Sequence, residues 1–378
     1  MQVETFSFKN SRWPPGGFPQ LDSEETLVLG FGDSKFFDQP APIAQLARAY
    51  PKSRLLGCST SGEISGTDVS ENGIAVAVSR FASGTLRTSF AGVGSAADSF
   101  AAGQNLARDL AEPNLRGALV LSDGLNMNGS ELVRGLNSVL PESVIVTGGL
   151  AGDGNRFKRT WVIHRGVPTT GLVSAVGFYG DRIRIGHGSR GGWDIFGPER
   201  TVTRSRGNVL YELDGKPALQ LYKQYLGERA SELPASALLF PLSLRTSSSD
   251  SKSLVRTVLA VDETNQSMTF ARDIQEGALA QLMKANFERF IQGASDAALM
   301  TRKSGAGSGP TLAVAISCVG RRLVLGERTE EEVEAVLDIL PAGVRQIGFY
   351  SFGEISPYAS GSCDLHNQTM TVTTIVEV

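Results

Sequence analysis

Cysteine, histidine and long apolar runs are scarce in this chain. Its 378 residues include three cysteines, Cys58, Cys318 and Cys363, whose spacing provides neither a disulfide framework nor a CxxC zinc pattern. No apolar run approaches the roughly 18 residues that a membrane-spanning helix needs. The N-terminus also lacks the basic-then-apolar order of a signal peptide. We therefore expect a protein of a reducing, cytoplasmic environment that has no membrane span.

An excess of one charge is also missing. The chain carries 36 basic and 39 acidic residues, a formal net charge of −3, so it offers no general electrostatic attraction to nucleic acid or to an anionic membrane. Basic residues cluster within Arg182–Arg206 and at Arg302-Lys303, and a solvated face is the ordinary explanation of such clusters. We do not expect nucleic acid as a partner.

Several motifs of enzyme chemistry are absent as well. No GxSxG, GKS, GKT or CxxCH pattern occurs, which removes support for a serine hydrolase, for phosphoryl transfer and for covalently attached haem. The glycine-rich run Gly305–Pro310 precedes an expected strand, whereas a dinucleotide-binding fingerprint follows a strand and opens a helix. We interpret this run as a linker.

The chain does contain a repeated segment. Arg54–Ser65 (RLLGCSTSGEIS) and Arg345–Ser356 (RQIGFYSFGEIS) align without a gap and are identical at six of twelve positions. A looser copy, Val144–Asp153 (VIVTGGLAGD), keeps the apolar run, the glycines and a final acid. Self-similarity of this kind indicates a fold built from repeated units.

The sequence around each copy predicts a β-α-β-turn-β unit. A short apolar run, typical of a strand buried on both faces, comes first: Thr26–Gly32, Ala118–Ser122 and Leu312–Ser317. An amphipathic helix follows and ends at a proline: Pro51, Pro141 or Pro341. A capping-box pattern, Thr329-x-x-Glu332, opens the third helix. A third strand leaves each glycine turn: Ile74–Val78, Leu172–Phe178 and Thr371–Val378. The expected fold class is α/β, with two domains built on mixed sheets.

The remaining segments are predicted one by one. Residues 1–25 are expected to form an irregular arm. We expect strands at Thr85–Phe90, Ser236–Leu244, Leu254–Val261 and Met268–Phe270, and a polar loop over Thr246–Ser253. Helices are expected at Asp98–Leu110, at Ala218–Leu226 and from about Gly277 onward. The main domain boundary is placed near residue 217, which divides the chain into residues 26–217 and 218–378.

Together, four motifs resemble those of the FIST family. They are Gly57-Cys-Ser-Thr-Ser-Gly-Glu-Ile, Gly148-Gly-Leu-Ala-Gly-Asp-Gly, Tyr211-Glu-Leu-Asp-Gly-Lys-Pro-Ala and Gly348-Phe-Tyr-Ser-Phe-Gly-Glu-Ile, and the later Asn367-x-Thr369 fits the same family. The resemblance covers residues 25–370 and implies an N-terminal and a C-terminal FIST domain. It also implies an intracellular sensory module that binds a small ligand, with amino acids as the suggested class. Some stand-alone members are haem proteins that sense nitric oxide and regulate a histidine kinase or cyclic-di-GMP enzymes.

The turn acids Glu63, Asp153 and Glu354 are the sharpest candidates for ligand binding. If the repeats are related by pseudo-symmetry, these carboxylates converge on one cleft and bind an ammonium or hydroxyl group. The alternative is a structural acid that accepts hydrogen bonds from its own turn. Asp123 and Asp33 follow first strands and are candidates to line a site at the carboxyl ends of the sheet. The further predicted ligand contacts are Cys58, Ser59, Thr60, Ser61 and Tyr350.

Two other chemistries remain open. Cys58 is the candidate nucleophile of an enzyme, but no histidine lies near it in sequence, so a small core residue is the favoured interpretation. Among the three histidines, His164, His187 and His366, we select His187 as a possible haem ligand because glycines flank it and Trp193 follows.

Overall fold

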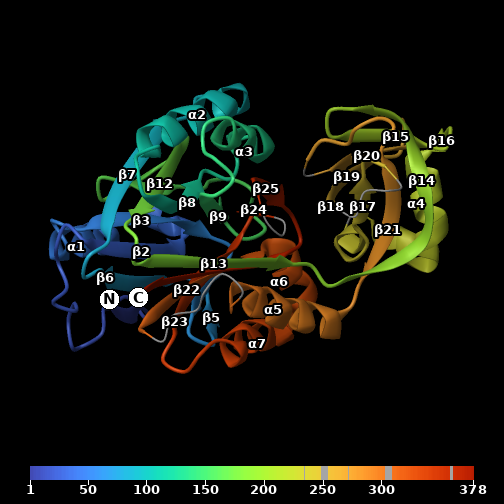
Figure 1. The fold of residues 1–378 in the computed structure, drawn as a ribbon. Helices are drawn as coiled ribbons and strands as arrows, with labels where there is room; N and C mark the ends of the chain where they lie inside the picture. Colours follow the sequence, from blue (N-terminus) through green and yellow to red (C-terminus); the bar gives the residue numbers. More distant parts are fainter. Residues whose placement is uncertain (234, 248–253, 271, 303–308, 358–360) are drawn as a thin grey trace.

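The repeated units build a large lobe, and one inserted segment builds a smaller lobe beside it (Figure 1). The computed structural model describes residues 1–233, 235–247, 254–270, 272–302, 309–357 and 361–378. Most of the predicted loop Thr246–Ser253 and of the run Gly305–Pro310 lies outside these residues.

The large lobe contains three six-stranded sheets, one for each repeat. In each repeat the first strand pairs in parallel with the strand after the helix and antiparallel with the third strand. These three strands are β2 (Thr26–Asp33), β3 (Arg54–Thr60) and β6 (Ile74–Arg80) in the first repeat. They are β8 (Leu115–Ser122), β9 (Ile145–Leu150) and β12 (Leu172–Tyr179) in the second. In the third they are β22 (Thr311–Cys318), β23 (Arg345–Ser351) and β26 (Met370–Glu377). The predicted β-α-β-turn-β unit is confirmed.

An additional antiparallel strand extends each sheet at the side of the third strand. The additional strands are β1 (Gln2–Phe8) on β6, β7 (Thr85–Gly92) on β12 and β13 (Ile183–Arg190) on β26. The prediction that residues 1–25 form an irregular arm is therefore wrong for β1. Residues 2–8 pair with the edge of the first sheet, which satisfies backbone groups that an irregular arm would leave to water.

Each repeat also donates a hairpin to another repeat. The hairpins are β4–β5 (Glu63–Ser65, Asp68–Ser70), β10–β11 (Val162–His164, Val167–Thr169) and β24–β25 (Gly353–Pro357, Cys363–His366). They pair with β23, β3 and β9, respectively. The first repeat thus extends the third, the third extends the second, and the second extends the first. Figure 1 shows β24 and β25 beside β9. This closed exchange joins the three repeats into one pseudo-threefold body.

The central core lies between the three sheets. It contains the inward side chains Leu27, Leu121 and Ile316 from the three repeats, and the rings of Phe31 and Phe349 lie 4.7 Å apart. The outer faces are covered by helices: α1 (Ala41–Ala49) on the first sheet, α2 (Ser99–Leu110) and α3 (Gly129–Asn137) on the second, and α5 (Phe287–Thr301) and α7 (Thr329–Ile339) on the third. Because both faces are covered, β2 and β22 are buried over their whole length and β8 is buried from Gly117 onward, as their apolar runs predicted.

A glycine of the repeated motif is required where the two parallel strands meet. A Cβ atom at Gly57, Gly148 or Gly348 would overlap the carbonyl oxygen of the preceding parallel strand. These three glycines therefore hold equivalent places in the repeats. This equivalence places Asp153 one position earlier than Glu63 and Glu354, which correspond to each other.

The small lobe comprises residues 193–285, inserted between β13 and α5. Its strands are β14 (Trp193–Arg206), β15 (Val209–Leu213), β16 (Lys216–Pro217), β17 (Leu242–Arg245), β18 (Leu254–Arg256), β19 (Val258–Asp262), β20 (Ser267–Phe270) and β21 (Leu279–Ala285). Helix α4 (Ala218–Leu226) packs on them. Both lobes contain residues from each side of position 217, so the lobes and the predicted sequence domains are different divisions of the chain.

Three local predictions are wrong, two of them in the small lobe and one on α7 of the large lobe. The segment from Gly277 begins as strand β21, because pairing with both β14 and β17 outweighs a helical spacing of apolar residues; the helix starts only at Phe287. The predicted strand Ser236–Leu244 begins as a 3-10 turn and becomes a strand at Leu242. The capping box at Thr329 does not form, because Glu332 is buried in an ion pair with Arg321.

No helix in the described parts of the chain is both long and apolar enough to cross a membrane.

Candidate functional site

The three glycine turns meet through their main chains. Ser61 N donates to Tyr350 O at 2.8 Å, Gly152 N to Ser59 O at 3.0 Å, and Phe352 N to Leu150 O at 3.1 Å. Each bond links one repeat to the next in a cyclic order, so the look-alike turns do gather at one end of the large lobe. Their acids, however, have other partners.

Glu63 and Glu354 occupy equivalent, buried positions. Thr60 Oγ1 donates to Glu63 at 2.7 Å, and Ser351 Oγ donates to Glu354 at 2.6 Å. The second oxygen of each carboxyl accepts from the residue before the third strand, Gly73 N at 3.3 Å and Thr369 N at 3.2 Å. Each acid therefore ties its glycine turn to the start of a neighbouring strand.

Burial dominates the ionisation of both carboxyls. It raises the pKa of Glu63 to about 8 and the pKa of Glu354 to about 7, although hydrogen bonds from Thr60 and Ser351 oppose this shift. Near neutral pH each group is held close to its titration point, where a proton can be gained or lost with a small change in surroundings.

In the second repeat Asp123 takes the place of these glutamates. Its two oxygens accept from Gly171 N at 2.7 Å and from Thr160 Oγ1 at 2.8 Å, and Gly171 again precedes a third strand. Asp153 instead accepts from the backbone N–H groups of residues 157–159, which fixes its own loop. The acid at the end of the looser copy is therefore not the counterpart of Glu63.

The structure does not bring Glu63, Asp153 and Glu354 together on one cleft. Glu63 lies where β4 joins β23, Glu354 lies where β24 joins β9, and Asp153 lies in the loop before β10. The expected convergence of three carboxylates is thus corrected: the main chains of the turns converge, whereas the acids are distributed among three junctions. Their ligand role stays a prediction.

The other predicted contacts are buried and bonded within the protein. Ser59 Oγ accepts from Trp161 N, and Ser61 Oγ accepts from Gly154 N, each at 3.0 Å. Tyr350 donates its hydroxyl to Glu332 at 3.0 Å. Cys58 lies in the central core, where burial raises the pKa of its thiol well above the ordinary value. These groups stabilise the turns, and the position of Cys58 favours the small core residue over the nucleophile.

The three histidines lie in different environments. His187 is 8% exposed on β13, burial lowers its pKa, and its Nδ1 has no hydrogen-bond partner among the described residues. His164 stacks against Phe90, with ring centroids 4.9 Å apart. His366 lines a cavity, and its Nε2 is 2.9 Å from Ser356 O. No group of three or more potential metal ligands occurs within the described residues.

A shallow charged pocket lies at the carboxyl end of β2. It offers about 320 Å³ and is lined by Asp33 and Asp153 together with basic side chains. Arg156 is 3.4 Å from Asp33, and Arg159 pairs with Asp38 at 2.7 Å. The charges of this pocket are thus largely paired on an exposed surface, where ion pairs contribute little.

Two cavities lie between the lobes, on the two sides of strand β18. One holds about 170 Å³ and is lined by Trp193, His366 and Asn367 among others. The other holds about 670 Å³ and is lined mainly by the small lobe, including Arg256 and Asp273, with Ser130 at the start of α3 from the large lobe. We call these two spaces the inter-lobe cleft. Asn367 belongs to the Asn367-x-Thr369 motif, and its buried Oδ1 accepts no hydrogen bond from the part of the chain that the structure describes.

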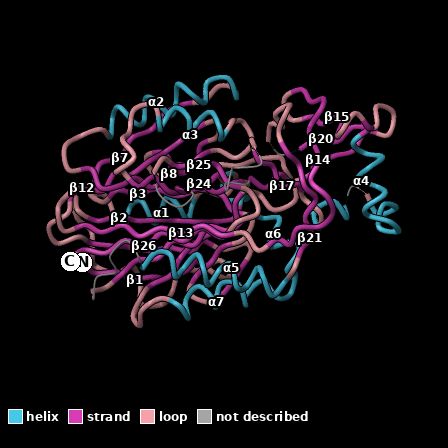
Figure 2. The backbone as a smooth tube through the Cα atoms, turned by 45° about the vertical axis from the view of Figure 1, so that its right-hand side comes forward, coloured by secondary structure: helices cyan, strands magenta, loops and turns pink. Residues whose placement is uncertain are grey.

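A buried ion pair holds the two segments that cross between the lobes. These segments, β13 into β14 and β21 into α5, lie side by side in Figure 2, and Trp193 pairs with Ala285. Arg321 donates to Gly191 O at 2.6 Å, to Phe290 O at 2.8 Å and to Glu332 at 2.6 Å. One guanidinium therefore fixes both crossings from the large lobe. No sequence motif indicated this ion pair and its backbone contacts, because the partners are far apart in the chain.

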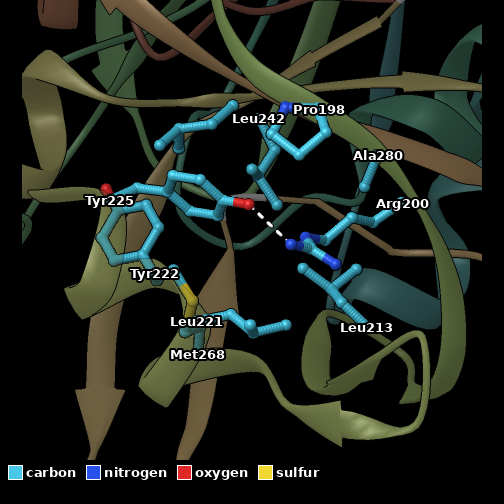
Figure 3. A pocket seen from close by; sticks show the side chains of 10 residues that line it. Pro198, Arg200, Leu213, Leu221, Tyr222, Tyr225, Leu242, Met268 and Ala280 are labelled. Atoms are coloured by element: carbon cyan, nitrogen blue, oxygen red, sulfur yellow. Dashed lines mark hydrogen bonds between the residues drawn. The ribbon is translucent and has the colours of Figure 1, made fainter.

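A separate small cavity lies inside the small lobe (Figure 3). It offers about 20 Å³ of space for water-sized occupants, and Arg200 donates to the Tyr225 hydroxyl at 2.6 Å beside it. This space is close to the volume of a single water. It is too small for an organic ligand.

Comparison with known proteins finds two family models that together match residues 26–216 and 218–357. The FIST N domain matches residues 26–216, and the FIST C domain matches residues 218–357. An uncharacterized protein found in two strains of Mycobacterium tuberculosis is 26% identical over 370 residues, covering 93% of this chain and 91% of the relative. An uncharacterized protein of Methanocaldococcus jannaschii is 26% identical over 231 residues, covering 56% of this chain and 41% of the relative.

Proposed function

Since the chain belongs to the FIST family, whose domains are associated with sensing in signal transduction, we propose that it is a sensor that binds a small ligand in the inter-lobe cleft. The observation that carries this proposal is the cavity of about 670 Å³ lined by both lobes. Pockets for small organic ligands commonly have about 300–1,000 Å³ and lie at domain interfaces.

The connection between the lobes would allow the small lobe to change its position relative to the large lobe. Only two crossing segments join them, and both are held by Arg321. A ligand that contacts both lobes binds best to one placement and therefore shifts the population towards it. In this mechanism the signal is a change of surface read by a separate partner. We propose a histidine kinase or a cyclic-di-GMP enzyme in the cytoplasm as that partner.

The mechanism involves binding without covalent chemistry. Cys58, the residue considered as a nucleophile, is fully buried in the core, and burial raises its pKa. The thiolate form that a nucleophile needs is thereby disfavoured. The proposal therefore assigns no catalytic residue.

The alternative function is that of a haem-based nitric oxide sensor. The described geometry fits it poorly: His366 is the histidine that lines a cleft cavity, and that cavity of about 170 Å³ is smaller than ordinary ligand pockets. His187, the histidine selected from the sequence, lies in a strand whose flanking glycines pack against α5. An absorbance spectrum of the purified protein tests this alternative, because bound haem gives a Soret band.

Isothermal titration with a panel of amino acids tests the leading proposal. We expect at least one member to bind with a stoichiometry of one per chain, and a bulky substitution at Ser130, such as Ser130→Trp, to weaken that binding by filling the cleft. The control is Glu24→Trp, at an exposed residue that does not line the cleft, and it should leave the binding unchanged. Full-strength binding to Ser130→Trp would place the ligand elsewhere.

A further inference from the structure

We propose that Arg256 and Arg272 form a binding site for an oxyanion, a carboxylate or a phosphate, carried by the ligand of the inter-lobe cleft. This inference rests on the proposed function and specifies the chemical class of the ligand. It is carried by the contacts of the two guanidinium groups and by the helix end that faces them.

Arg272 reaches from the small lobe to the large lobe. It follows β20, yet its Nη2 would lie 3.1 Å from a Cβ atom built at Gly129, the first residue of α3, and 3.1 Å from one built at Gly353, the first residue of β24. The guanidinium therefore lies against the glycine turn of the third repeat, next to Glu354.

Among the described residues, Arg272 has unused hydrogen-bond donors. Its Nε is buried and has no partner, and no residue in the described part of the chain accepts a hydrogen bond from this guanidinium. A guanidinium presents five N–H donors, and the Arg272 side chain is partly exposed, so its donors are accessible to a ligand. Such an arrangement is expected where a ligand completes the site.

Arg256 adds a second cation, near enough to act on the charge of Arg272. It is 9% exposed on β18 and lines the cavity of about 670 Å³. Its hydrogen bonds go to the backbone oxygens of Asp273 and Val255, both at a long 3.3 Å. Burial and the neighbouring Arg256 lower the pKa of Arg272 to about 10, so the two cations destabilise each other.

The acidic groups nearby do not neutralise this pair. Glu354 and Asp273 favour the charged form of Arg272, and Asp364 and Asp273 favour that of Arg256. The oxygens of Glu354, however, are engaged with Ser351 and Thr369. Neither arginine forms a salt bridge with a described residue within 4 Å.

The helix end in the cleft also favours an anion. Arg272 lies at the N-terminus of α3, where the helix dipole is positive, and Ser130 on its first turn lines the cavity. A cation alone is unfavourable at this end of a helix, whereas an oxyanion between the helix and the guanidinium is favourable.

Arg322 provides a matched comparison on the first glycine turn. Its guanidinium lies 2.9 Å from a Cβ atom built at Gly62, as Arg272 lies against Gly353. Arg322, however, donates to Ser61 O and pairs with Glu71 at 2.7 Å. A purely structural arginine on this turn is thus bonded to protein groups, and Arg272 departs from that pattern.

The test is isothermal titration of the full chain with glycine, L-glutamate, succinate and inorganic phosphate. We expect at least one of these oxyanions to bind, and Arg272→Gln to weaken that binding about tenfold or more because a charged, forked donor is lost. Arg272→Lys, which keeps the charge and loses the fork, should lie between. Arg322→Gln should bind as the wild type does. Circular dichroism verifies folding, and Arg256→Gln provides the same test if Arg272→Gln does not fold.

Each outcome of the titration either supports the oxyanion site or overturns it. A preference for the carboxylates or for phosphate identifies the source of the oxyanion. Failure of all four compounds to bind, or equal binding by Arg272→Gln and Arg322→Gln, would overturn it. A ligand that binds the cleft without dependence on Arg272 would overturn this inference and leave the proposed sensor intact. Oxyanion binding that depends on Arg272 but leaves the lobes unmoved would support the site and contradict the sensor.

Discussion

At the scale of residues, the repeated acids act as structural ties. Glu63 and Glu354 have the same partners in the two repeats: a hydroxyl three residues earlier and the N–H group before the third strand. The gapless alignment predicted this equivalence correctly. It could not reveal that Asp123 replaces them in the second repeat, because that acid comes from a different strand and reaches its place only through tertiary packing.

The pH dependence of stability tests the burial of Glu63. Its pKa of about 8 exceeds the ordinary value of 4.5, so the folded protein holds a proton that the unfolded chain releases. The contribution of this group to the free energy of unfolding is fully present below pH 4.5 and is lost as the pH rises through 8. We expect Glu63→Gln to reduce the loss of stability between pH 5 and pH 8 by roughly 2–4 kcal/mol. Urea denaturation at both pH values measures it.

The control for this experiment is Glu24→Gln, which changes an exposed carboxylate. It should retain the pH dependence of the wild type. The same dependence in Glu63→Gln would show that this carboxyl is ionised in the folded protein over the whole range.

The thiol of Cys58 should be inert in the folded protein. It is fully buried in the central core, and burial raises its pKa. We expect alkylation by iodoacetamide at pH 8 to occur only as fast as the protein unfolds, since a thiol reacts through its exposed thiolate. Mass spectrometry of the modified peptide measures the rate. Rapid labelling under native conditions would restore the nucleophile interpretation.

At the scale of elements, local sequence predicted the repeats better than the insertion. Apolar runs and helix-ending prolines located the strands and helices of the three repeats within a few residues. In the small lobe, β21 has a spacing of apolar residues that fits a helix, and only its pairing with two strands makes it extended. The exchange of hairpins was equally hidden, because register between distant strands leaves no local signal.

The motif glycine of the third repeat should tolerate no side chain. A Cβ atom at Gly348 would overlap the carbonyl oxygen of Ala315. We expect Gly348→Ala to lower the free energy of unfolding by about 1–3 kcal/mol, the usual range for overpacking. Gly92→Ala is the control, because no atom lies within 4 Å of the new Cβ, and it should change stability by less than about 0.5 kcal/mol. Chemical denaturation compares the two variants.

The ion pair of Arg321 and Glu332 should contribute strongly to stability at the two segments that cross between the lobes. Arg321→Met leaves Glu332 buried without its cation, and removal of one partner of a buried pair costs about 3–5 kcal/mol. The double substitution Arg321→Met with Glu332→Leu should recover a large part of this loss, because no uncompensated charge remains. Thermal unfolding of both variants measures this recovery. An equal loss of stability in the single and the double variant would show that Arg321 stabilises the protein mainly through contacts other than its ion pair with Glu332.

At the scale of the whole molecule, the family and fold class follow from sequence, and the ligand site does not. The repeated motif predicted that the turn acids contact the ligand, but these acids accept hydrogen bonds from the main chain. Arg256 and Arg272 both come from an insertion without repeats. Arg272 reaches the third glycine turn, and Arg256 reaches the cleft, only after folding. The site is therefore a product of how the two lobes face each other.

The most direct test of this account is the distance between the lobes with and without ligand, measured by fluorescence energy transfer. Labels on Ala101→Cys in α2 and Gln220→Cys in α4 are selective, because Cys58, Cys318 and Cys363 are buried and both new sites are exposed. The account predicts that a bound oxyanion changes this distance in the wild type and leaves it unchanged in Arg272→Gln. Stoichiometric binding with no change of distance in the wild type would contradict it.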